Sequence, residues 1–227
     1  MQRIYADRAD AGRALAAALE SHRGEHGTIV LGLPRGGVPD AYEIAARLDL
    51  PLDVLVVRKL GLPSQPELAM GAIASGGALV RNDEVVRYLG GRDDAFEAVR
   101  AKEQQELERR ERDYRGDRPP LDLRDRIGIL VDDGLATGAT MEAAVRALQA
   151  LGARRVVVAV PVASPEARDR IAAVADEVVC LAAPVFFSAV GQWYQDFGQT
   201  SDEEVHDLLA RAHARVKSDR SGGGAKP

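Results

Sequence analysis

The chain has 227 residues, of which 46% are hydrophobic, enough to form the core of one domain. Aromatic residues make up only 4% and the formal net charge is −5, which argues against a base-stacking nucleic-acid surface and against binding to DNA or an anionic membrane. The N-terminus lacks the apolar core of a signal peptide, and no apolar run reaches the roughly 18 residues of a membrane span, so we expect a cytoplasmic protein.

The first part of the chain predicts a helix, a strand and a second helix. Residues 7–21 have the apolar spacing of an amphipathic helix, 28–33 form a short apolar strand, and 40–48 form the next helix. The loop between this strand and helix contains Arg35 followed by two glycines, Gly36 and Gly37. Glycines let the backbone approach an anion and arginine adds guanidinium donors, although a plain glycine-rich turn explains the loop equally well.

The next region predicts a strand with cations at its end. Residues 52–57 are apolar, and Arg58 and Lys59 follow at once, where they could neutralise an anion. Residues 60–69 have no regular period, and 70–80 predict a weak hairpin. Residues 93–115 are highly charged and predict an exposed helix, which is one surface through which two copies could meet.

Residues 127–140 carry the most specific pattern of the chain. An apolar strand ends at two carboxylates, Asp132 and Asp133, and a loop of small and hydroxyl residues then opens a helix over 141–151. Carboxylates at the end of a strand can accept hydrogen bonds from sugar hydroxyls or help to hold Mg²⁺. The N–H groups of such a loop and the helix dipole favour a phosphate. The stretch therefore predicts a sugar-phosphate site, the alternative being an ordinary strand–helix turn with an acidic strand end.

The last third of the chain continues the alternation of strands and helices. We expect a strand at 155–162, a helix at 165–175 and a strand at 177–181, which together favour a parallel α/β sheet. Aromatic residues then gather within 183–199, where core filling and stacking on a flat base are both reasonable interpretations. A final helix is expected from 201 to about 216.

The pattern Asp-Asp-x-x-Ala-Thr-Gly-x-Thr resembles the phosphoribosyl-pyrophosphate (PRPP) signature of type I phosphoribosyltransferases. The resemblance covers roughly residues 28–182. It implies a Rossmann-like parallel sheet of about five strands flanked by helices, with a flexible lid hairpin and a small C-terminal aromatic hood. It also implies a single domain over 1–217, with a hood at about 183–200 that includes contributions from the N-terminal helix, and a disordered tail at 218–227.

The resemblance assigns roles to particular residues. Asp132 and Asp133 would hold the ribose hydroxyls and, indirectly, Mg²⁺, and with Lys59 they would form the catalytic set. The 5′-phosphate would bind to the loop formed by Ala136, Thr137, Gly138, Ala139 and Thr140. Pyrophosphate would bind to Arg35, Gly36, Gly37, Arg58 and Lys59. The hood would offer its aromatic residues, Phe186, Phe187, Trp193 and Tyr194, to the base.

The implied reaction is transfer of the phosphoribosyl group from PRPP to a purine or pyrimidine base, with Mg²⁺ and release of pyrophosphate. The alternative is a non-catalytic regulatory protein of the same fold that binds PRPP or a nucleotide. We expect PRPP and a small base as partners, no DNA and no membrane, and a homodimer.

The acceptor base is left open by departures from the family patterns. Enzymes for 6-oxopurines carry an acid where this chain has Ala136, and orotate enzymes have a basic lid, whereas no Lys, Arg or His occurs between Lys59 and Arg81. Adenine enzymes place a Glu in a Leu-Glu-Tyr-Gly run where this chain reads Leu-Ala-Met-Gly at 68–71. Glu67 lies two residues before that position, and we hypothesise that it substitutes.

Overall fold

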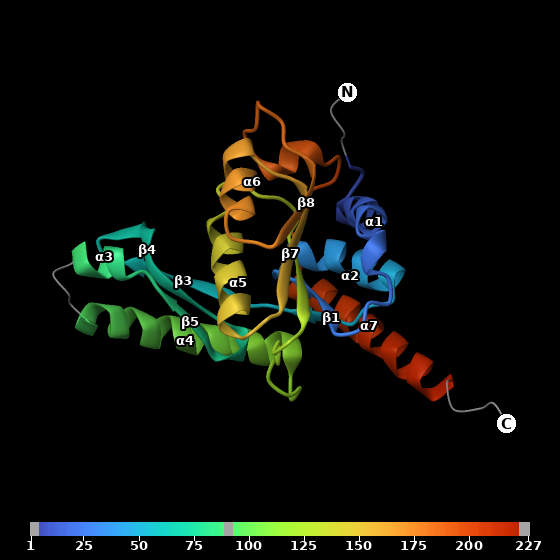
Figure 1. Ribbon diagram of the computed structural model, residues 1–227, viewed down its shortest axis with the longest axis horizontal. Helices are drawn as coiled ribbons and strands as arrows, with labels where there is room; N and C mark the ends of the chain where they lie inside the picture. Colours follow the sequence, from blue (N-terminus) through green and yellow to red (C-terminus); the bar gives the residue numbers. More distant parts are fainter. Residues whose placement is uncertain (1–4, 89–92, 223–227) are drawn as a thin grey trace.

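A parallel sheet of five strands in the order β2-β1-β6-β7-β8 forms the centre of the molecule (Figure 1). The computed structural model describes residues 5–88 and 93–222, without the side chains of 66, 67, 88, 93 and 216–222. The strands are β1 (Thr28–Gly32), β2 (Leu52–Val54), β6 (Ile127–Val131), β7 (Arg155–Val162) and β8 (Glu177–Ala182). The α/β fold class predicted from the sequence is confirmed.

Helices cover both faces of this sheet (Figure 1). Helices α1 (Arg8–Ala18), α2 (Gly37–Leu48) and α7 (Asp202–Gly222) lie on one side, and α5 (Ala139–Ala150) and α6 (Pro165–Ala172) lie on the other. Successive strand residues point to opposite faces. Val30 and Ile129 therefore pack with α1, α2 and α7, while Leu31 and Leu130 pack with α5 and α6. This alternation explains why the strands are apolar throughout.

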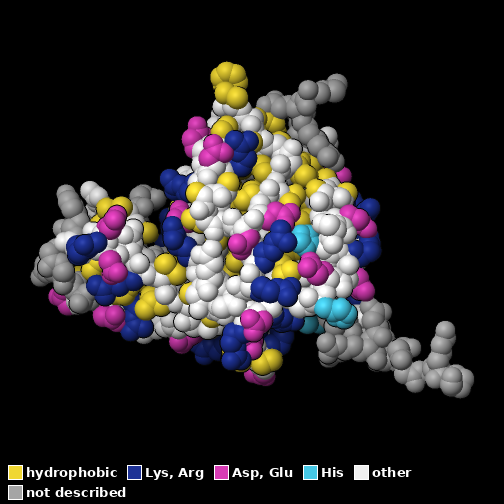
Figure 2. All heavy atoms as spheres, in the orientation of Figure 1, with side chains coloured by type: hydrophobic (Ala, Val, Ile, Leu, Met, Phe, Trp, Pro, Cys, Tyr) yellow, Lys and Arg dark blue, Asp and Glu magenta, His cyan; other side chains and the backbone are white. Residues whose placement is uncertain are grey.

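A second, antiparallel sheet projects from the core with two helices beside it, and we call these elements together the arm (Figure 1). Its strands are β3 (Val57–Leu62), β4 (Gln65–Ala74) and β5 (Ala78–Arg81), and its helices are α3 (Asp83–Tyr88) and α4 (Asp93–Arg115). Figure 2 shows acidic and basic side chains mixed over the arm and the core on this face. The arm occupies the region that the resemblance assigns to the lid.

The strand boundaries in the arm correct two sequence-based expectations. The strand expected over 52–57 is divided between two sheets, because the buried Ser75 accepts a hydrogen bond from Val56 N through its hydroxyl and donates one to Val56 O through its N–H, at 3.0 and 2.9 Å. These bonds lead the chain from the parallel sheet into the arm. The stretch 60–69, expected to be irregular, contributes to the pairing of β3 with β4.

The remaining elements follow the predicted order, with differences at their ends. The long charged helix covers 93–115 and the strand covers 155–162, as predicted. Helix α7, expected to end near 216, extends to Gly222, so residues 218–222 are helical rather than part of a disordered tail. Residues 223–227 lie outside the described residues. In the part of the chain that is described, no helix has the length and apolarity needed to cross a membrane.

Candidate functional site

Strand register brings the two predicted anion-binding loops together. Gly32, the last residue of β1, pairs with Val131, the last residue of β6, and Leu33 N donates to Val131 O at 2.9 Å. The loop that follows β1 and the carboxylates that follow β6 therefore leave the same edge of the sheet as neighbours. In open α/β sheets this edge, at the carboxyl ends of the strands, is where ligands bind.

The glycines of the first loop allow close contact with the carboxylates. A Cβ atom on Gly36 would overlap Asp133 Oδ2, and one on Gly37 would overlap Val131 O and lie 2.8 Å from Asp132 Cα. A side chain at either position would collide with these atoms, so the approach of the two loops requires glycine. The peptide bond between Pro34 and Arg35, just before these glycines, is cis.

The predicted phosphate loop is fixed to the core and open toward solvent. Leu135 bridges to Ala163 beyond the end of β7, and Ser164 Oγ donates to Ala136 O at 2.8 Å. Gly138 adopts a left-handed conformation with φ 74° immediately before α5 and carries no capping side chain, and the first N–H of the helix, that of Ala139, makes only a long bond of 3.4 Å to Thr137 Oγ1. The uncapped first turn leaves N–H groups for a ligand. The candidate contact residues Ala136, Thr137 and Thr140 are exposed beside it.

The carboxylates at this edge are partly buried and close to one another. Burial, reinforced by the nearby Asp133, raises the pKa of Asp132 well above its usual range. Burial also raises the pKa of Asp133, against the lowering effect of Arg8. Arg8, from α1, places Nε and NH2 2.9 Å from Asp133 Oδ2. A third acid, Asp40 on α2, is fully buried near this pair, and neither of its carboxyl oxygens has a hydrogen-bond partner.

The predicted hood residues occupy different environments. Trp193 and Tyr194 are buried, with 2% and 6% of their surface exposed, and Tyr194 OH donates to Asp133 O at 2.6 Å. Burial, together with the nearby acids Asp40 and Asp133, raises the pKa of Tyr194. Both rings therefore belong to the core, and neither offers a free face in this conformation. Phe187 is half-buried and Phe186 is 88% exposed, so these two residues retain accessible rings.

The predicted pyrophosphate-binding cations have different neighbours in the structure. Arg35 lies 3.7 Å from Asp202 at the start of α7. Arg58 donates to Glu103 on α4 through Nε at 2.8 Å, which ties β3 to α4. Lys59, the next residue of β3, lies on the opposite face of the strand and lines a pocket. The side chain of Glu67, the hypothetical lid acid, lies outside the described residues.

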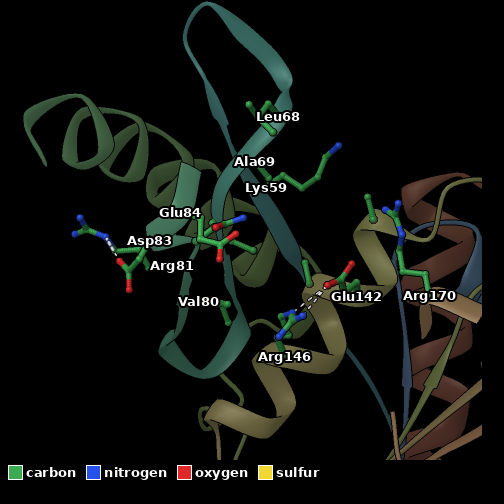
Figure 3. A pocket seen from close by; sticks show the side chains of 15 residues that line it. Lys59, Leu68, Ala69, Val80, Arg81, Asp83, Glu84, Glu142, Arg146 and Arg170 are labelled. Atoms are coloured by element: carbon green, nitrogen blue, oxygen red, sulfur yellow. Dashed lines mark hydrogen bonds and ion pairs between the residues drawn. The ribbon is translucent and has the colours of Figure 1, made fainter. Parts of the chain in front are cut away.

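A pocket of about 530 Å³ is lined by residues of the arm, of α5 and of α6 (Figure 3). Lys59 enters it from β3, Arg146 and Glu142 from α5, and Arg170 from α6. Arg146 pairs with Glu142 at 2.8 Å. The lining also includes Ala139, the first residue of α5. The pocket therefore adjoins the predicted phosphate loop and brings Lys59 to its side.

The donor set fits a magnesium ion that arrives with a phosphate ligand better than a resident metal. Within residues 5–88 and 93–222 there is no group of three or more His, Cys, Asp or Glu residues arranged to hold a metal ion. Asp132 and Asp133 supply adjacent carboxylates, and Mg²⁺ is commonly bound by one or two carboxylates, waters and substrate phosphates.

Comparison with known proteins identifies the family. The model of the phosphoribosyl transferase domain matches residues 2–195, which is most of the chain. The chain belongs to the phosphoribosyl transferase domain family.

Relatives of this phosphoribosyl transferase domain protein include two Mycobacterium tuberculosis proteins, Rv0571c and MT0597, which are provisionally named as phosphoribosyl transferases. Each is 53% identical to it over 211 residues. The match covers 93% of this chain and 47% of each relative, so the chain spans about half their length. The crystal structure of TT1426 from Thermus thermophilus is 48% identical, with a TM-score of 0.84, and the match covers 92% of this chain and 98% of that one.

Sequence reasoning missed two residues that the family fold brings to the site, Arg8 and Asp40. Both lie in regions predicted to be helical, but the spacing of apolar residues says nothing about which other segment a helix end approaches. Asp40 had one available signal, because it is an acid in the first turn of a helix that directly follows a glycine loop. Arg8 is 125 positions away from its partner Asp133, and no local pattern connects them.

Proposed function

We propose that this protein transfers the 5-phosphoribosyl group from PRPP to a nitrogenous base, a purine or pyrimidine, and releases pyrophosphate. The observation that carries the proposal is the close approach of the Arg35–Gly37 loop to Asp132 and Asp133, with the phosphate loop beside them. This arrangement supports one ligand that has a phosphate at one end, sugar hydroxyls in the middle and a second anionic group at the other end.

Each part of the site has a role in the proposed reaction. Loop 136–140 binds the 5′-phosphate through backbone N–H groups and the hydroxyls of Thr137 and Thr140. Asp132 and Asp133 accept hydrogen bonds from the ribose hydroxyls and orient the sugar. Arg35, the N–H groups of Gly36 and Gly37, and Lys59 receive the pyrophosphate. Asp132 and Asp133 would also help to hold Mg²⁺, which would supply positive charge for the leaving group.

The reaction breaks the bond between C1′ and the pyrophosphate oxygen, and the pyrophosphate leaves with the electron pair. The lone pair of the acceptor nitrogen forms the new bond to C1′, and the proton that this nitrogen carried is released to water. The sugar acquires positive charge between these events, so correct positioning and electrostatic stabilisation supply most of the acceleration, and no covalent nucleophile is needed. Closure of the arm over the ligand would exclude water from this reactive state.

The test is calorimetric titration of PRPP with Mg²⁺ into the wild type and into the Asp132→Asn/Asp133→Asn variant. Hydrogen bonds to charged groups contribute about 1.5–3 kcal/mol each, so we expect the affinity to fall at least tenfold. The matched control is Asp122→Asn/Asp125→Asn, which removes two exposed acids from the surface and should bind like the wild type.

An assay of pyrophosphate release with a panel of purine and pyrimidine bases completes the experiment. Release with one base would establish the transferase and identify its acceptor. Binding of PRPP without release for any base would instead favour the regulatory alternative. Absence of PRPP binding in the wild type would contradict both.

A further inference from the structure

The side chain of Arg8 joins three segments that are far apart in the sequence. Its Nε and NH2 atoms are 2.9 Å from Asp133 Oδ2, and NH1 donates to Gly198 O at 2.7 Å. Its guanidinium also lies over the ring of Phe197, 4.0 Å from the ring centre. Only 13% of the side chain is exposed. The first helix, the end of β6 and the C-terminal aromatic segment therefore meet at this one cation.

The positive charge of Arg8 acts on three nearby acids. Asp40, Asp132 and Asp133 influence one another, and Arg8 lowers the pKa of each. Three carboxylates in a desolvated site cannot all be ionised with one guanidinium beside them. Arg8 makes its direct contact with Asp133, and burial raises the pKa of Asp132 and Asp40 well above the usual range.

Arg8 contacts only one of the two carboxylate oxygens of Asp133. Its Nε and NH2 atoms both lie against Oδ2, the oxygen that closely approaches Gly36. Oδ1 is thus left available to an incoming donor. Two donors of the planar guanidinium converge on Oδ2 and hold that oxygen in place, which restricts the positions open to Oδ1. The backbone at Asp133 is held as well, since Tyr194 OH donates to its carbonyl.

We propose that Arg8 is a positioning residue that holds Asp133 in place, so that Oδ1 accepts a hydroxyl hydrogen bond from the sugar of the phosphorylated ligand. This inference rests on the proposed function. Arg8 acts through Asp133 and does not contact the reacting atoms. The N-terminal helix thereby becomes part of the ligand site, although it lies outside the loops that carry the family signature.

The test measures PRPP affinity in Arg8→Ala, Arg8→Lys and a control on the same helix, Arg13→Ala. Arg13 is 53% exposed and pairs with surface acids, so its loss should leave the affinity unchanged. We expect at least a tenfold loss of affinity in Arg8→Ala and a smaller loss in Arg8→Lys, which keeps the charge without the fork. Adding millimolar methylguanidinium to Arg8→Ala should restore much of the affinity, whereas methylammonium should restore less. A purely structural role would not show this selectivity.

Several outcomes would overturn the inference. Unchanged affinity in Arg8→Ala would show that Asp133 needs no partner, and tighter binding would show that Arg8 obstructs the site. A loss that methylguanidinium does not reverse would indicate a structural role alone. If Arg8→Ala does not fold, Arg8→Gln, which keeps most of the side-chain length, undergoes the same comparison. No PRPP binding by the wild type would reject the proposed function and this inference together, whereas the other outcomes reject the inference alone.

Discussion

Asp40 is the most isolated charge-bearing group among the residues around the site. It is fully buried on α2, and neither carboxyl oxygen has a hydrogen-bond partner. Burial, followed by the charges of Asp133 and Asp132, raises its pKa well above the usual value, while Arg8 opposes the rise. A carboxyl group in this position is stable only when it is protonated. At near-neutral pH the presence of Asp40 therefore lowers the free energy of unfolding.

We predict that Asp40→Asn is more stable than the wild type at pH 8, because an amide at this position carries no charge to be suppressed by burial. The folded pKa lies above the unfolded value, so the favourable contribution of protonated Asp40 is fully present below the unfolded pKa. It is lost as pH rises through the folded pKa. The advantage of the variant should therefore disappear near pH 4.

Urea unfolding of Asp40→Asn and the wild type at several pH values between 4 and 8 would measure this difference. Glu43→Gln, a change on the same helix at a partly exposed side chain, is the control and should show little pH dependence relative to the wild type. An Asp40→Asn variant that is less stable by the same amount at every pH would contradict the prediction, because the cost would then come from packing alone.

At the scale of elements, the alternation of side chains along β3 places Arg58 and Lys59 on opposite faces of the strand. Arg58 is used to attach α4 through Glu103, whereas Lys59 lines the pocket beside the phosphate loop. The sequence-based assignment gave both residues the same role. Because Arg58 makes its contact within the arm, Lys59 is the one of the two to which we assign the proposed binding of pyrophosphate.

We predict that Lys59→Met lowers the rate of pyrophosphate release at least tenfold with little change in Tm, because it removes a positive charge where negative charge develops. Arg58→Met should lower the Tm, by the loss of a partly buried ion pair worth about 1 kcal/mol, and should have the smaller effect on turnover. Steady-state assays and thermal unfolding of both variants would check this. The reverse order of effects would show that the arm presents Arg58 to the ligand.

Local sequence patterns were sufficient to predict the elements that are determined by residues close together in the sequence. The apolar runs predicted the core strands, and the spacing over 93–115 predicted α4, because burial and helix periodicity are visible within a short window. The pair Asp132–Asp133 and the small-residue loop after it also form one continuous stretch, so this part of the site could be predicted. The division of 52–57 between two sheets could not, since it depends on Ser75 approaching from another part of the chain.

At the scale of the whole molecule, the N-terminal segment and the aromatic segment before α7 meet beside the site. Tyr5 pairs with Tyr194 in an isolated parallel bridge, and its N–H donates to Trp193 O at 2.8 Å. The rings of Tyr5, Tyr194 and Phe197 follow one another at centre distances of 5.7 and 5.0 Å, ending at the guanidinium of Arg8. Contacts between residues so far apart in the sequence leave no local sequence pattern. The positions of the hood residues could therefore be predicted from the sequence, whereas their surroundings could not.

Tyr5 should therefore control both stability and the integrity of the site. Its side chain is fully buried, and truncation of a large buried ring costs about 3–5 kcal/mol, so we predict that Tyr5→Ala lowers the Tm by about 10 °C. PRPP affinity should fall as well, because Tyr194 and Arg8 would lose the packing that places them against Asp133. Tyr42→Ala, at a half-buried ring on α2, is the control and should preserve the affinity.

The single tryptophan of the chain, Trp193, provides a direct measurement of this coupling. It is buried beside Tyr5, so in Tyr5→Ala its emission should shift to the red and become more accessible to acrylamide quenching, whereas Tyr42→Ala should retain the wild-type spectrum. An unchanged Trp193 spectrum together with weakened PRPP binding would mean that Tyr5 affects the ligand by another route. Unchanged emission and unchanged affinity would show that the aromatic segment holds its place without the N-terminal residues.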